Sequence, residues 1–212
     1  MSLNMTQQAM ISIVVKECMD LGISVKLIHK QCILSHGLSC GGYFDSKEKE
    51  LAVATDSDCW IASLMHEYYH MKQWIEGFKY YTGDEPYTVV GKWLEGSNKY
   101  TSLDAQRAAY CVIYKEQDCE KRVISALYTC PDLGVDPVWY TKRTNAAMYF
   151  RTLSVQKRKW LIPGKSPFIY KELMPDYLLY PEEYWNIPAN IREAMEDCFE
   201  SPDSTTESAP AS

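Results

Sequence analysis

Two histidines four residues apart, His66 and His70, and the glutamate that follows the first, Glu67, are the residues best placed to do chemistry in this sequence. On a helix, side chains four residues apart lie on one face and are close enough to share a small cation. Neutral imidazole is a common zinc ligand. A glutamate beside such a metal can take a proton from a bound water. The spacing therefore predicts a zinc site with a base next to it.

The residues around this motif predict the helix that the spacing requires. Apolar side chains recur there at three- and four-residue steps, as on one face of a buried amphipathic helix. They belong to Ile61, Leu64, Met65, Tyr68, Met71 and Ile75. Asp56 or Ser57 offers a cap for the first turn, and Gly77 offers a stop. A pair of structural histidines is the alternative, but two of only four histidines in the chain lie in the motif, which favours a metal site.

The motif leaves one ligand to be found, because a catalytic zinc takes three protein ligands and a water. A second helix is predicted over about residues 103 to 127. On it Glu116 and Glu120 are four apart and share a face, whereas Asp118 points elsewhere. One carboxylate can bind the metal and the other can orient a ligating histidine through its free ring nitrogen. The alternative is a solvated acidic face, balanced by neighbouring basic residues.

Together the two motifs resemble those of gluzincin-type peptidases, in which His-Glu-x-x-His is followed by a glutamate on a later helix. The resemblance implies that Glu116 is the third zinc ligand and that Glu120 orients a histidine. Here Glu120 stands where Asp or Asn is commonest, and Cys119 stands where Ala or Ser is commonest. The residues themselves therefore leave Glu116 and Glu120, or Asp118, as alternatives for the third ligand.

Five short stretches are also similar to an uncharacterised bacteriophage family of metallopeptidases, over about residues 38 to 175. They are Cys40 to Asp45, His66 to Gln73, Asp118 to Arg122, Thr144 to Ala147 and Arg158 to Trp160. This resemblance implies a phage-encoded enzyme that works in the cytoplasm of the host cell.

A further group is expected near the metal, because a donor there would stabilise the oxyanion that forms when water attacks a peptide carbonyl. A helix is predicted to open at Asp136 and Pro137 and to run to about residue 157. Tyr149 on this helix is the predicted donor. Tyr140 and Asn145 lie on the same helix and are the alternatives, since most of the sixteen tyrosines must be packing or half-exposed residues.

Composition excludes several classes of partner. The net charge of −6 and a pI near 5.3 argue against nucleic acid, which requires a basic surface. The sequence contains no run of 18 apolar residues, so no membrane span is expected. Residues 1 to 10 lack the pattern of a secretory signal. The eight cysteines are therefore expected to be reduced thiols in the cytoplasm.

The predicted fold is α+β, a zincin-like single domain over residues 1 to 200. A helix over residues 6 to 21 and a strand over residues 23 to 28 are followed by a hairpin over residues 41 to 55, which leads into the motif helix. We expect this small sheet to pack on the motif helix. Its edge strand could hold an extended peptide, or it could serve only as a wall of the core.

The remaining segments have weaker patterns. Residues 77 to 101 are predicted to be a loop or a pair of short elements. The proline- and aromatic-rich stretch from Trp160 to Tyr184 is predicted to wrap the domain in extended form, and a short helix is predicted within residues 188 to 199. Residues 201 to 212 are predicted to be a disordered tail.

The sequence thus predicts a Zn²⁺-dependent metallopeptidase that hydrolyses peptide bonds of a protein or peptide, with Glu67 as general base. The alternative is a non-catalytic, metal-stabilised binding protein that acts on a host protein. A purely structural metal site has no need of a base, so Glu67 favours the enzyme. The sequence specifies neither the substrate nor an oligomeric state.

Overall fold

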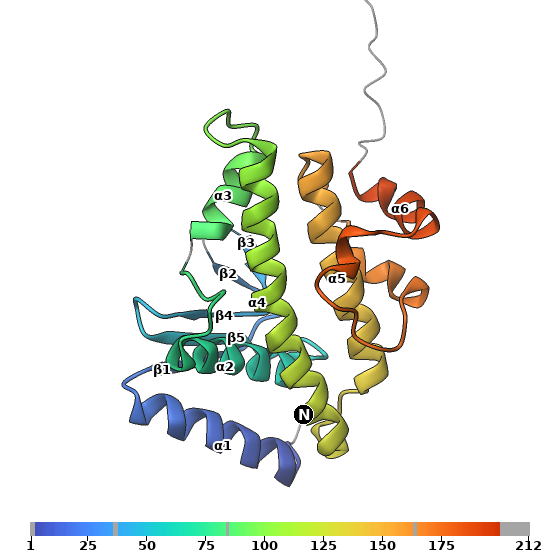
Figure 1. Ribbon diagram of the computed structural model, residues 1–212. Coiled ribbons are helices and arrows are strands. Elements are labelled where there is room, and N and C mark those ends of the chain that lie inside the picture. Colours follow the sequence, from blue (N-terminus) through green and yellow to red (C-terminus); the bar gives the residue numbers. More distant parts are fainter. Residues whose placement is uncertain (1–2, 36–37, 84, 163–164, 200–212) are drawn as a thin grey trace, which may run out of the picture.

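The computed structural model describes residues 3–35, 38–83, 85–162 and 165–199. The described chain is α+β and mostly helical, with a small mixed sheet near its N-terminal end, as the sequence predicts (Figure 1). Its helices are α1 (Met5–Asp20), α2 (Trp60–Glu76), α3 (Glu85–Leu94), α4 (Ser102–Thr129), α5 (Pro137–Lys157) and α6 (Ala189–Met195). Its strands are β1 (Ser24–Ile28), β2 (Ile33–Ser35), β3 (Leu38–Cys40), β4 (Gly42–Asp45) and β5 (Glu50–Ala54). No helix within these described ranges is long and apolar enough to cross a membrane.

The main sheet has the order β1-β5-β4, with β1 parallel and β4 antiparallel to β5. Strand β5 is central, which explains why four successive residues, Leu51 to Ala54, are fully buried. Leu51 and Val53 face α1 and α2, whereas Ala52 and Ala54 face the hairpin of β2 and β3. The predicted hairpin is confirmed, and it leaves β4 at one edge of the sheet.

Helix α2 carries the metal motif along the apolar face of the sheet. Its buried side chains form the predicted stripe, which packs on α1, β5 and the C-terminal half of α4. It ends at Gly77, whose backbone is left-handed with φ 64°, as a stop glycine requires. It begins after Cys59 without a side-chain cap, so the predicted caps at Asp56 and Ser57 are wrong.

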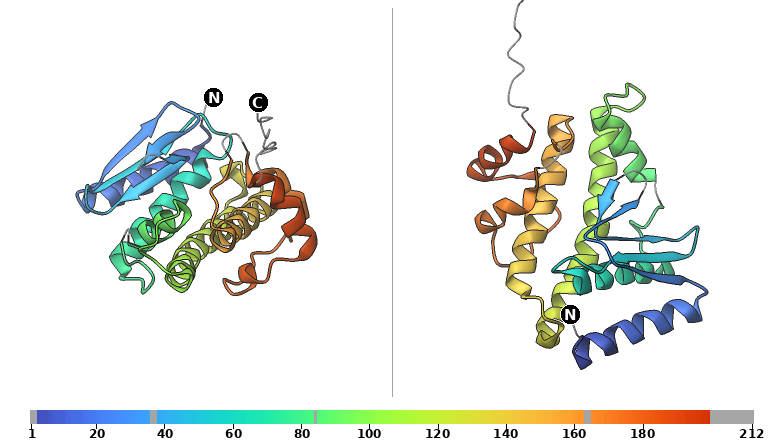
Figure 2. Two further views of the ribbon diagram at one scale, coloured as in Figure 1. Left: turned by 90° about the horizontal axis from the view of Figure 1, so that it is seen from above. Right: turned by 180° about the vertical axis from the view of Figure 1, so that it is seen from behind.

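Helices α4 and α5 form a long pair that stands between the sheet and the C-terminal segment (Figures 1 and 2). Thr101 caps α4 in a reciprocal capping box with Asp104, and Asp136 caps α5 ahead of Pro137. Asp136 is the cap that the sequence predicts for α5, and Thr101 is one of its two candidates for α4, the other being Ser102. Within the segment predicted as a loop or short elements, α3 forms and packs on the N-terminal half of α4.

The C-terminal segment covers α5 on the side away from the sheet (Figure 2). It contains short 3-10 turns over residues 167–173, 183–185 and 196–198, so the predicted extended form of Trp160 to Tyr184 is wrong in its local conformation. The short helix predicted within residues 188 to 199 is confirmed by α6. Asn145 of α5 anchors it: its amide donates to the carbonyls of Pro175 and Tyr177 and accepts from Leu179 N and the Tyr184 hydroxyl. The predicted tail over residues 201 to 212 lies outside the described residues.

Candidate metal centre

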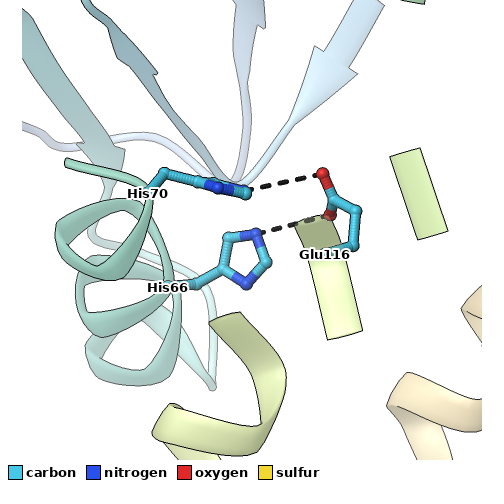
Figure 3. A group of neighbouring side chains, drawn as sticks. All are labelled: His66, His70 and Glu116. Atoms are coloured by element: carbon cyan, nitrogen blue, oxygen red, sulfur yellow. Dashed lines mark ion pairs between the residues drawn. The ribbon is translucent and has the colours of Figure 1, made fainter. Parts of the chain in front are cut away.

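Three side chains from two helices meet at the face of α2 that looks toward α4 (Figure 3). His66 Nε2 lies 3.5 Å from Glu116 Oε2, and His70 Nε2 lies 3.5 Å from Glu116 Oε1. One potential ligand atom from each residue lies within 4.8 Å of the other two. The structure therefore brings together the two histidines of the motif and one of the three candidate carboxylates.

These separations leave room for a shared ion. A hydrogen-bonded imidazolium and carboxylate approach to about 2.7–2.9 Å. Two ligand atoms that a zinc ion holds at tetrahedral angles, each about 2.1 Å from it, are about 3.4 Å apart. Both nitrogen to oxygen distances in this cluster are 3.5 Å, close to the second value. Two imidazoles and one carboxylate are also the ligand chemistry of catalytic zinc sites.

Gln73 fixes which nitrogen of His70 carries the proton. The fully buried Gln73 amide nitrogen lies 2.8 Å from two acceptors, the carbonyl of Lys115 and Asp118 Oδ2. Its oxygen must therefore face His70 Nδ1, 3.0 Å away, and this nitrogen must carry the hydrogen. His70 Nε2 then keeps its lone pair toward Glu116, as a metal ligand requires.

Glu120 lies behind the other histidine. Its Oε1 is 3.4 Å from His66 Nδ1, on the side of the ring opposite Glu116. Burial alone would raise the pKa of Glu120, but the charge of His66, its close contact and the Tyr140 hydroxyl outweigh it and leave the pKa lowered. Glu116 therefore faces both Nε2 atoms while Glu120 supports one ring from behind. Asp118 instead binds Arg122 and Gln73.

Two further residues contact Glu116 that sequence reasoning missed. The Tyr87 hydroxyl of α3 donates to Glu116 Oε1, and Arg151 of α5 donates to Oε2 at 3.5 Å. Burial alone would raise the pKa of Glu116, but the charge of Arg151, followed by the two facing imidazoles, holds it well below its ordinary value. No local sequence pattern places either residue beside Glu116. Tyr87 lies in a segment without a sustained hydrophobic period, and Arg151 comes from another helix, so both contacts depend on tertiary packing.

The Glu67 side chain extends from α2 toward the edge strand β4. Only 8% of the residue is exposed, and its burial raises its pKa although His66 and His70 oppose the shift. Gly42 of β4 makes this arrangement possible. A Cβ at that position would lie 2.9 Å from Glu67 Cγ and 2.9 Å from the Ala52 carbonyl oxygen, closer than real Cβ contacts. Glu67 therefore lies against the backbone of an edge strand.

Tyr149, the predicted oxyanion donor, lies in a different part of the molecule. It is 4% exposed within the cluster under the C-terminal segment, and its ring packs edge-on against Tyr184 at a centroid distance of 5.4 Å. Among the described residues, Tyr149 makes no contact with His66, His70 or Glu116. Tyr87 instead contacts one of them, Glu116.

In comparisons with known proteins, no family model, curated protein or solved structure matches this chain.

Proposed function

We propose that this protein is a zinc-dependent metallopeptidase with a zincin-like domain, in which His66, His70 and Glu116 hold the metal and Glu67 is the general base. The observation that carries the proposal is the convergence of three ligand atoms within 4.8 Å, from residues of two helices far apart in the sequence. The arrangement around them supports it, because both Nε2 atoms face the carboxylate and each outer nitrogen faces an oxygen of a buried side chain.

A zinc ion in this site would supply an acidified water and a Lewis acid for the substrate carbonyl. Glu67 would accept the proton of the attacking water and return it to the leaving amine. Its raised pKa suits this exchange, because a base whose pKa lies nearer to neutral pH can also act as an acid.

The edge strand β4 would place the substrate. It pairs with β5 on one side only and passes directly over Glu67 at Gly42. An extended peptide that paired with this strand through main-chain hydrogen bonds would lie across the base and the metal ligands. This geometry favours a protein or peptide substrate.

The test uses zinc-loaded protein, short fluorogenic peptides and a bacterial lysate. Glu67→Gln should lower turnover by about 10²- to 10⁴-fold and leave zinc content unchanged, because only the proton acceptor is lost. Glu76→Gln is the matched control, since Glu76 lies on the same helix with 44% of its side chain exposed. Full activity of Glu67→Gln would refute the assignment of the base.

The second candidate is a metal-stabilised binding protein that acts on a host protein. Burial of the site favours it, because only 14% of the His66 side chain and 9% of the His70 side chain are exposed. It predicts that zinc raises the melting temperature while no chelator-sensitive cleavage occurs in the lysate. Chelator-sensitive cleavage that Glu67→Gln removes would exclude it.

A further inference from the structure

Arg151 is a half-exposed cation beside the buried ligands. Its side chain is 43% exposed, whereas that of Glu116, its partner, is 8% exposed. In the described part of the chain its one hydrogen bond is the 3.5 Å contact with Glu116 Oε2, which is long for a charge-assisted bond. A guanidinium has five N–H donors, so most of those of Arg151 remain available to a ligand that approaches from solvent.

The charge around Arg151 favours an anion. Glu116 is the partner that offsets its charge, and a metal ion in the proposed site would draw on that same carboxylate. A second cation lies close by, because Lys115 Nζ is 4.3 Å from the centroid of the Tyr87 ring, and the Tyr87 hydroxyl donates to Glu116. Lys115 thus lies on the ring of Tyr87, and Arg151 contacts the carboxylate to which Tyr87 donates, so two positive side chains lie near Glu116 although the chain as a whole has a net charge of −6.

We propose that Arg151 forms an anion-binding subsite that recognises a carboxylate of the peptide substrate, an inference that rests on the proposed function. The planar fork of an arginine binds a carboxylate through two parallel hydrogen bonds, which gives direction as well as attraction. The carboxylate can belong to an acidic side chain or to the C-terminus of the peptide. A role limited to offsetting the charge of Glu116 would leave peptide preference unchanged.

The experiment measures binding, so that it does not depend on turnover. Zinc-loaded Glu67→Gln protein is titrated with three fluorescent peptides of one length. The first has glutamate at alternate positions and an amidated end, the second has glutamine there and a free C-terminal carboxylate, and the third has glutamine and an amidated end. We expect the first or the second to bind about 10- to 100-fold more tightly than the third, as one charge-assisted contact allows. The stronger of the two identifies the source of the carboxylate.

Substitutions on the same background assign the preference to Arg151. Arg151→Gln should remove it, and Arg151→Lys should keep part of it, because lysine retains the charge without the fork. Arg107→Gln is the control, since Arg107 is an exposed arginine on α4 remote from Glu116. Zinc content is measured for each variant. If Arg151→Gln no longer binds zinc, the peptide preference of Arg151→Lys serves as the test instead.

Equal binding of the three peptides, no binding of any of them, or a preference that survives in Arg151→Gln would overturn the subsite. Absence of hydrolysis by the wild-type protein, with the peptide preference intact, would instead contradict the proposed function alone.

Discussion

Two buried polar networks, one on each side of the α4 and α5 pair, differ in how completely their hydrogen bonds are satisfied. Around Asn145, the amide nitrogen donates to two carbonyls and the amide oxygen accepts from a backbone N–H and a tyrosine hydroxyl. Around Glu116, buried His66 Nδ1 and Glu120 Oε2 have no hydrogen-bond partner of good geometry. Unsatisfied buried polar groups are rare in native proteins. The first network is closed and holds the C-terminal segment to α5, whereas the second is left incomplete on the side of the His66 ring that faces Glu120.

The largest expected effect separates these two networks. Glu116→Ala should abolish stoichiometric zinc binding, so that zinc no longer raises the melting temperature. Asn145→Ala should bind zinc as the wild type does, but should lose about 2 to 4 kcal/mol of unfolding free energy, because several buried partners are left without hydrogen bonds. Zinc content is measured by elemental analysis and stability by chemical denaturation. Loss of zinc from a folded Asn145→Ala protein would break the comparison.

A smaller effect is expected where Glu67, the proposed base, meets the sheet. Gly42→Ala should lower turnover by about 10²-fold with zinc content unchanged, because the added methyl group displaces Glu67 or β4. Gly91→Ala is the matched control, since a Cβ at that position meets nothing within 4 Å. Steady-state kinetics on a fluorogenic peptide measure the effect. Wild-type turnover in Gly42→Ala would show that the close contact does not position the base.

The smallest effect is expected at the residue that orients a ligand. Gln73→Met keeps a similar volume but removes the amide oxygen that faces His70 Nδ1 and leaves only the Cys119 sulfur, 3.1 Å away and a weak acceptor, so the dissociation constant for zinc should rise about 10- to 100-fold. Lys72→Met, one position earlier on α2, changes a side chain that binds Glu17 instead and should leave zinc affinity unchanged. Competition with a zinc chelator measures both. Equal affinities would remove Gln73 from the description of the site.

The elements that carry the ligands could be predicted because their signals are local. The apolar stripe of α2, the capping residues Thr101 and Asp136, and the hairpin of β4 and β5 all follow from short-range patterns that tertiary packing then reinforces. Spacing alone predicts only a carboxylate on a second helix and leaves Glu116, Glu120 and Asp118 as alternatives; the resemblance to gluzincins points to Glu116.

The groups that surround Glu116 could not be predicted, because each arrives from a distant element. Tyr87 depends on how α3 packs on α4, and Arg151 depends on the approach of α5. Tyr149 was chosen from the same helix as Arg151, but it lies on a side that the C-terminal segment covers. Helical periodicity gives the faces of α5, but it does not say which of them meets the site.

The origin of the ligands on two separate helices has a mechanical consequence. His66, His70 and Gln73 all belong to α2, so this helix alone can form half of the site, and Glu116 completes it only when α4 has docked. A bound ion would then act as a removable cross-link that closes the loop of chain between α2 and α4. Chelation should therefore loosen the contact between these helices first, and hydrogen exchange along both would register the release before the sheet opens.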